Sequence, residues 1–133
     1  MAKTVIFKGK ETFGKDFTII DTHANVKLVS NGMRAILNAI DKYEEKQAKA
    51  KKPVTLMDYQ DIISDEVITQ TGKLLGLSTE DTKKLENVSY SEVFNFYSKA
   101  ANEFADMEIP SVDKIKQSLV ASNEEAVNTK DPK

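Results

Sequence analysis

The chain has 133 residues, of which 40% are hydrophobic and 30% are charged, and this composition indicates one soluble globular domain. It contains no cysteine, which excludes disulfides, thiolate chemistry and cysteine-based zinc sites and suits a reducing cytoplasm. The 19 basic and 21 acidic side chains leave a net charge of -2, which argues against a broadly basic nucleic-acid-binding protein. No apolar run is long enough to cross a bilayer or to act as a secretory signal.

Residues 1–20 are typical of a short β-hairpin. The runs at 4–7 and 17–20 are rich in β-branched and aromatic residues, and the polar segment between them contains Gly9 and Gly14. We expect one buried face, formed by Phe7, Phe13, Phe17 and Ile19. Because an isolated hairpin is only marginally stable in water, this one must pack on the helices that follow.

From Thr22 the apolar period becomes that of a helix. Apolar side chains recur at alternating spacings of three and four residues, at Val26, Val29, Met33, Ile36, Ile40 and Tyr43. Gly32 costs about 1 kcal/mol in a helix interior, which leaves two alternatives. Either one helix spans 22–49, or an extended piece over 25–30 precedes a helix from Asn31. We favour the single helix because the stripe crosses Gly32 without losing phase.

Three more helices are predicted over 55–75, 79–86 and 90–107. Pro53 separates the first of them from the preceding helix, because proline disfavours a helical conformation at the residue before it. Each helix begins at a hydroxyl side chain with an acidic residue three positions later, the pattern of a helix cap: Thr55, Ser78 and Ser89, the last as a full capping box. Gly76 provides a left-handed stop.

The end of the chain is predicted to hold one more helix, over 111–121, with a polar, disordered tail over 122–133. The sequence therefore predicts a mainly α fold. It is a bundle of four to five helices in a single domain over 1–121, with a short β-hairpin at its N-terminus.

Two of the predicted helices carry more apolar surface than one neighbour can cover. The 90–107 helix is apolar over about half of its circumference, which indicates either a central position in the core or a groove for another helix. The 55–75 helix has an apolar flank beside its main stripe, and contiguous exposed apolar area usually marks a partner site. The candidate partner-binding residues are Met57, Ile68, Leu75, Phe94, Phe96, Phe104 and Met107.

Catalytic and metal chemistry are not indicated. An acidic cluster at Asp58, Asp61, Asp65 and Glu66 has no glycine-rich ion loop and no histidine at ligand spacing, so we expect a solvated helix face. His23 is the single histidine and lies near a helix start with no nucleophile motif nearby. The common hydrolase, phosphate-binding and dinucleotide-binding motifs are absent. We expect a protein that is not an enzyme and that uses no cofactor and no metal.

The alternative interpretation is a small helical DNA-binding transcriptional regulator. Residues 74–81 have the order of a helix-turn-helix, and the lysines within 46–52 could contact phosphates. The second helix would carry Glu80, Asp81 and Glu86, however, and DNA repels such a surface.

The order of elements along the whole chain is more informative than any one motif. Residues 17–45 lead from a β-rich start into an amphipathic helix, and residues 75–107 lead from Leu-Gly-Leu through Lys-Leu-Glu to an aromatic helix. This pattern resembles that of the tail assembly chaperones of long-tailed (siphovirus-type) bacteriophages that infect Gram-positive bacteria. The family has no catalytic signature.

The resemblance implies a non-enzymatic protein in the cytoplasm of the infected bacterial host, not expected in the mature virion. Such chaperones bind the long, helical, hydrophobic tape measure protein and keep it soluble until the major tail protein polymerises around it. The expected partners are therefore the tape measure protein, the major tail protein as a further candidate, and other copies of the chain in a homo-oligomer. A membrane or a nucleic acid is not expected. Many family members also exist in a longer, frameshifted form.

Overall fold

The structure, a computed structural model, describes residues 2–111 and is mainly helical with a short N-terminal antiparallel hairpin, which confirms the predicted fold class. In chain order the elements are β1 (Thr4–Phe7), α1 (Lys10–Phe13), β2 (Phe17–Ile20), α2 (His23–Ala50), α3 (Leu56–Leu75), α4 (Thr79–Lys84), the 3-10 helix η1 (Leu85–Asn87) and α5 (Tyr90–Ala105). The helix predicted at 111–121, apart from its first residue, and the tail predicted at 122–133 lie outside the described residues. Within 2–111, no helix combines the length and the apolar character that crossing a membrane requires.

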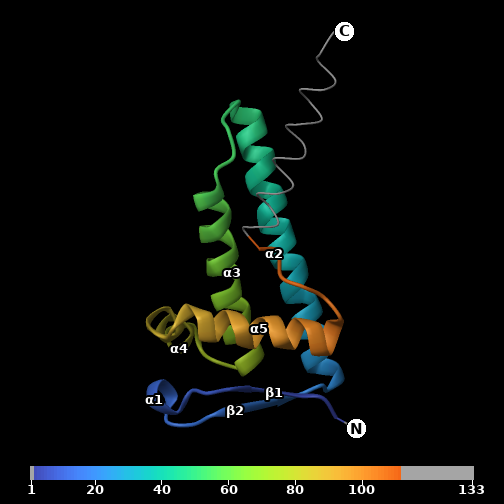
Figure 1. The fold of residues 1–133 in the computed structure, drawn as a ribbon, viewed down its shortest axis with the longest axis vertical. Helices are drawn as coiled ribbons and strands as arrows, with labels where there is room; N and C mark the ends of the chain where they lie inside the picture. Colours follow the sequence, from blue (N-terminus) through green and yellow to red (C-terminus); the bar gives the residue numbers. More distant parts are fainter. Residues whose placement is uncertain (1, 112–133) are drawn as a thin grey trace.

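The long helices α2 and α3 form an antiparallel pair, and α5 crosses both of them near one end (Figure 1). The hairpin lies on the far side of α5 and contacts it through β1, while α4 packs beside the end of α3. On the other side of α5, the paired helices project well beyond the crossing. We call this projecting part the arm (residues 40–60).

The hairpin buries one face against α5. Its strands pair Val5 with Ile19 and Phe7 with Phe17, so these four side chains share the inner face. The ring of Phe7 packs edge-on against Phe96 of α5 with 5.4 Å between ring centroids, which joins the sheet to the helices. The predicted face is corrected in two respects. Val5 belongs to it, whereas Phe13 lies on the one-turn helix α1 and is half-buried.

Side-chain caps begin three of the four longer helices. The hydroxyl oxygens of Thr22, Thr55 and Ser78 accept from the amides of Asn25, Asp58 and Asp81, each at 3.1 Å. The capping box predicted at Ser89 is wrong. The amide of Glu92 donates instead to the backbone carbonyl of Ser89 at 3.1 Å, and the Ser89 side chain makes no cap hydrogen bond. α5 therefore begins at the predicted position, but the first free amides are capped by the backbone carbonyl of Ser89 and not by its side chain.

The single helix predicted over 22–49 is confirmed by α2, and α5 explains the glycine within it. Gly32 is buried at the crossing, where a β-carbon would overlap the hydroxyl of Tyr97 and lie 3.0 Å from Oε1 of Gln70 on α3. Tyr97 is 0% exposed, and its hydroxyl has no hydrogen-bond partner within the described structure. Glycine at position 32 weakens the helix, but the missing side chain allows α2, α3 and α5 to pack closely at this point.

Gly32 and Tyr97 are expected to be energetically coupled. Gly32→Ala should destabilise the chain by about 1–2 kcal/mol, because overpacking outweighs the helix preference of alanine. Tyr97→Phe should be nearly neutral, since the hydroxyl that it removes is buried and unpaired. In the Tyr97→Phe background, Gly32→Ala should cost less than about 0.5 kcal/mol. Urea denaturation of the four proteins measures the coupling, and additive effects would contradict the proposed overlap.

Two tyrosines hold the end of the arm. The hydroxyl of Tyr43 donates to the Asp58 carboxylate at 2.8 Å and accepts from the Thr55 amide at 2.9 Å. The hydroxyl of Tyr59 donates to the Glu44 carboxylate at 2.6 Å. The two rings pack edge-to-face with centroids 5.2 Å apart. These contacts tie the end of α2 to the start of α3 on both sides of the loop.

The arm should lose stability in alkali. Burial, followed by the hydrogen bond to Glu44, raises the pKa of Tyr59 well above its ordinary value of 10.0. A raised folded-state pKa gives stability that is fully present below the unfolded-state value and is lost as the pH rises above about 10. The free energy of unfolding should therefore fall less steeply above about pH 10 in Tyr59→Phe than in the parent chain. Urea titrations of both proteins at matched pH test this, and parallel curves would refute it.

Candidate functional site

One face of α3 points away from the core along most of the helix. It includes Met57, which is 78% exposed, the exposed Asp61 and Asp65, and the half-buried Ile68. These positions follow one another at spacings of three and four residues, so they lie in one row. We call this row the outer face of α3. A hollow opens on each side of it.

The first hollow lies between α3 and the N-terminal turns of α5, and we call it the α3/α5 groove. Its volume is about 560 Å³. It is lined by Gln60, Ile63, Tyr90, Ser91, Phe94, Asn95, Pro110 and Ser111. Tyr90 and Phe94 stand one helical turn apart with their ring centroids 5.9 Å apart. Tyr90 is 38% exposed and Phe94 is half-buried, so aromatic surface reaches the solvent here.

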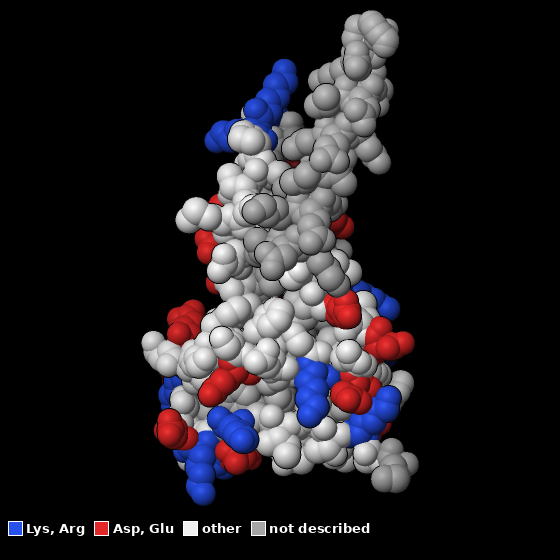
Figure 2. Space-filling model, viewed as in Figure 1, with Lys and Arg blue, Asp and Glu red and all other residues white. Residues whose placement is uncertain are grey.

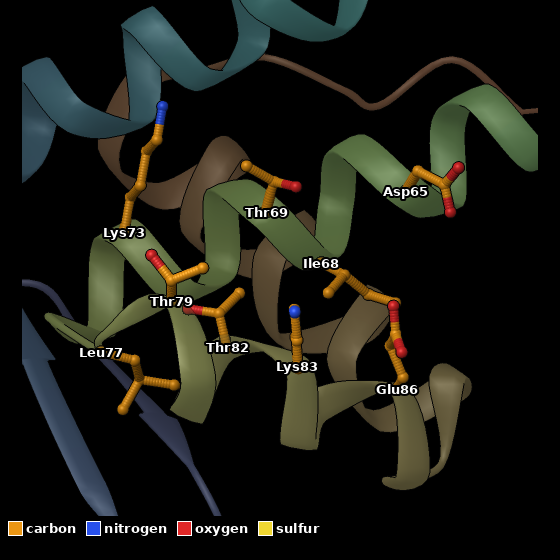
Figure 3. Close-up of a pocket in the computed structure, with 9 residues that line it drawn as sticks. All are labelled: Asp65, Ile68, Thr69, Lys73, Leu77, Thr79, Thr82, Lys83 and Glu86. Atoms are coloured by element: carbon orange, nitrogen blue, oxygen red, sulfur yellow. The ribbon is translucent and has the colours of Figure 1, made fainter.

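The second hollow, the α3/α4 cleft, has a volume of about 470 Å³ and, unlike the groove, charged residues in its lining. Figure 3 shows Ile68 of α3 pointing toward α4, with Lys83 and Glu86 pointing back toward α3. The remaining lining residues are Asp65, Thr69, Lys73, Leu77, Thr79 and Thr82. Charges of both signs and three threonines surround the apolar side chains of Ile68 and Leu77.

The arm is electrostatically uneven. Figure 2 shows acidic side chains along its flanks and basic side chains at its end, whereas both signs mix on the lower part of the molecule. The end of the arm carries the exposed Lys49, Lys51 and Lys52. Burial, with the charge of Asp65 as a second cause, raises the pKa of Tyr90.

The seven residues predicted to bind a partner have different environments in the fold. Met57 is exposed, and Ile68, Phe94 and Met107 are half-buried. Leu75, Phe96 and Phe104 belong to the hydrophobic core. Phe96, for example, packs on the hairpin through Phe7. The structure thus brings Phe94 to the α3/α5 groove and Ile68 to the α3/α4 cleft, whereas Leu75, Phe96 and Phe104 are buried in the core and line neither of these hollows.

Sequence reasoning missed the groove residues that accompany Phe94. Tyr90 lies four residues before Phe94, and this spacing places both on one side of a helix, so the signal was present. Pro110, which follows the predicted 90–107 helix, also lines the groove. Gln60 and Ile63 join the groove because α5 crosses α3 at this level, and no local pattern in the sequence contains that information.

The part of the chain that the structure describes contains no cluster of side chains suited to hold a metal ion. Among residues 2–111, no three histidine, aspartate or glutamate side chains come together as metal ligands. The proposed recognition helix of a helix-turn-helix, α4, has six residues, and its Asp81 pairs with Lys84 at 3.0 Å. So short a helix, which itself carries the exposed Glu80, offers little to a DNA groove.

Comparisons of the chain with protein-family models, with curated proteins and with solved structures find no match.

The burial of Leu75 and the exposure of Met57 predict opposite outcomes for the same substitution. Leu75 is 8% exposed, so Leu75→Glu should destabilise the chain by about 3 kcal/mol or more through a buried, unpaired carboxylate. Met57→Glu should change stability by less than about 0.5 kcal/mol, because the residue is exposed in the first turn of α3, where a negative charge is favourable. Chemical denaturation compares them directly. A similar loss in both variants would show that the two residues are equally buried.

Proposed function

We propose that the chain is a phage tail assembly chaperone that binds the tape measure protein and keeps it soluble during tail morphogenesis. The observation that carries the proposal is the α3/α5 groove, where Tyr90 and Phe94 present aromatic surface beside a buried Ile63. An open apolar groove between two helices fits the apolar stripe of a third helix. The tape measure protein of such phages, as the resemblance implies, is long, helical and hydrophobic.

Binding proceeds by insertion of apolar side chains of the client into the groove. Tyr90 and Phe94 provide large contact areas on the helix α5, whose position the core determines. Met57, farther along the outer face of α3, provides a flexible apolar contact that adapts to different side chains. A single groove of this size gives a weak contact, which also permits release when the major tail protein replaces the chaperone.

Many weak contacts are sufficient if several copies act on one client. A long client offers repeated helical segments, and copies that associate with one another hold their grooves at high local concentration. We therefore propose a homo-oligomer that coats the tape measure protein in the host cytoplasm without catalysis. No cofactor has a role in this mechanism.

The proposal is tested by co-expression with the tape measure protein of the same phage. The parent chain should raise the soluble fraction of the tape measure protein several-fold, and Tyr90→Gln with Phe94→Gln should remove most of that gain. Leu28→Gln is the control, because Leu28 on α2 is 38% exposed, the same as Tyr90, and lies outside the groove. Each variant is first checked for unchanged helical circular dichroism.

Equal precipitation of the tape measure protein with and without the parent chain would overturn the proposed function. An equal loss of solubilisation in the groove variant and in Leu28→Gln would instead show that the α3/α5 groove is not the binding surface.

A further inference from the structure

The first seventeen residues of α3 carry charge of one sign only. Between residues 56 and 72 the helix has four carboxylates, Asp58, Asp61, Asp65 and Glu66, and no lysine or arginine. Such a segment is uncommon on a chain whose overall charge is only -2. A partner that binds α3 therefore experiences the negative potential of this segment more strongly than the net charge of the chain.

Two of these carboxylates have partners within the fold and two do not. Asp58 accepts the hydroxyl of Tyr43 at 2.8 Å, and Glu66 accepts the side-chain amide of Gln70 at 3.3 Å. The side chains of Asp61 and Asp65 are exposed and make no hydrogen bond or ion pair within residues 2–111. They stand one helical turn apart, so their charges act on the same region of solvent.

The two free carboxylates lie on the outer face of α3, next to the side of the helix that lines the α3/α5 groove. Asp61 is adjacent in the chain to Gln60, which lines the groove, and the charge of Asp65 contributes to the raised pKa of Tyr90 at the groove's edge. Asp65 itself lines the α3/α4 cleft, whose opposite wall includes Lys83. Unpaired negative charge thus follows α3 between the groove and the cleft.

We propose that the α3/α5 groove selects a cationic amphipathic helix, whose apolar stripe contacts Tyr90 and Phe94 while its lysine or arginine side chains pair with Asp61 and Asp65. This inference rests on the proposed function and specifies the chemistry of the client segment. Hydrophobic contact supplies affinity, and the carboxylates orient the helix and reject acidic segments. Copies of the chain would then bind a long client only at segments where basic residues flank the apolar stripe.

The test uses two labelled helical peptides of about 18 residues, long enough for five turns. Both have leucines at positions i, i+3, i+4 and i+7, and they differ only in the flanking residues, which are lysines in one and glutamates in the other. Fluorescence anisotropy with the full chain at low salt should show at least about tenfold tighter binding of the lysine peptide. At about 0.5 M salt the preference should shrink to less than about threefold, because the charges are exposed.

The variant Asp61→Asn with Asp65→Asn should reduce the preference at low salt to about twofold. Its matched control is Glu103→Gln with Asp106→Asn, which makes the same change in net charge with two exposed carboxylates at the opposite end of α5. The control should keep the full preference. An equal reduction in both variants would assign the preference to net charge and would overturn the inference.

The remaining outcomes separate this inference from the proposed function. Equal binding of both peptides would overturn the selection of a cationic helix and leave helix binding intact. Binding of neither peptide would overturn both proposals.

Two other occupants of the groove are also tested. The chain's own residues 112–121 include apolar and basic side chains, and the groove would belong to them if Ile115→Asp with Leu119→Asp strengthened the binding of both peptides by about tenfold or more. The groove would bind a second copy of the chain if the variant Asp61→Asn with Asp65→Asn no longer self-associated, as measured by light scattering. Either result would overturn the inference.

Discussion

The close approach of α5 to α2 at Gly32 is the constraint on which the rest of the structure depends. Tyr97 occupies the space that a side chain at this position would fill, and Gln70 brings α3 to the same point. Because three helices meet there, the position of α5 along the α2–α3 pair is determined. From the other side of α5, Phe96 holds the hairpin through Phe7. The three helices therefore pack closely at this point. The cost is that the buried Tyr97 hydroxyl has no hydrogen-bond partner within the described residues.

The exposed features of the molecule follow from that crossing. α5 covers one end of the α2–α3 pair and leaves the arm to project beyond it (Figure 1). The N-terminal turns of α5 then overhang α3, and the groove with Tyr90 and Phe94 is the space that remains between them. The groove is therefore built from rigid helices, which lowers the conformational entropy lost when a partner binds. Under the proposed function, a preformed site suits a chaperone that binds many segments of a client and later releases them.

The carboxylates of this surface fall into two groups, those that have partners within the fold and those that do not. At the end of the arm, Tyr43 and Tyr59 hydrogen-bond to the carboxylates of Asp58 and Glu44, and these contacts stabilise the arm. The side chains of Asp61 and Asp65 make no hydrogen bond or ion pair within residues 2–111 and lie on the exposed outer face of α3, where Asp65 also lines the α3/α4 cleft. Apolar contact alone would accept any hydrophobic helix, whereas in our proposal these carboxylates distinguish between helices of similar hydrophobicity.

The sequence by itself determined the elements of this fold, since periodicity, caps and stops depend on residues within a turn or two of each other. It predicted a continuous α2 through Gly32 and the stop of α3 at Gly76. It missed the one-turn helix α1 within the hairpin, and at Ser89 a backbone carbonyl accepts the amide that the side chain was expected to bind. Only the tertiary structure decided which apolar residues are exposed. Phe94 and Phe96 are two residues apart on one helix, yet one borders the groove and the other is core, because burial depends on helices that are distant in the sequence and on the angle at which they cross.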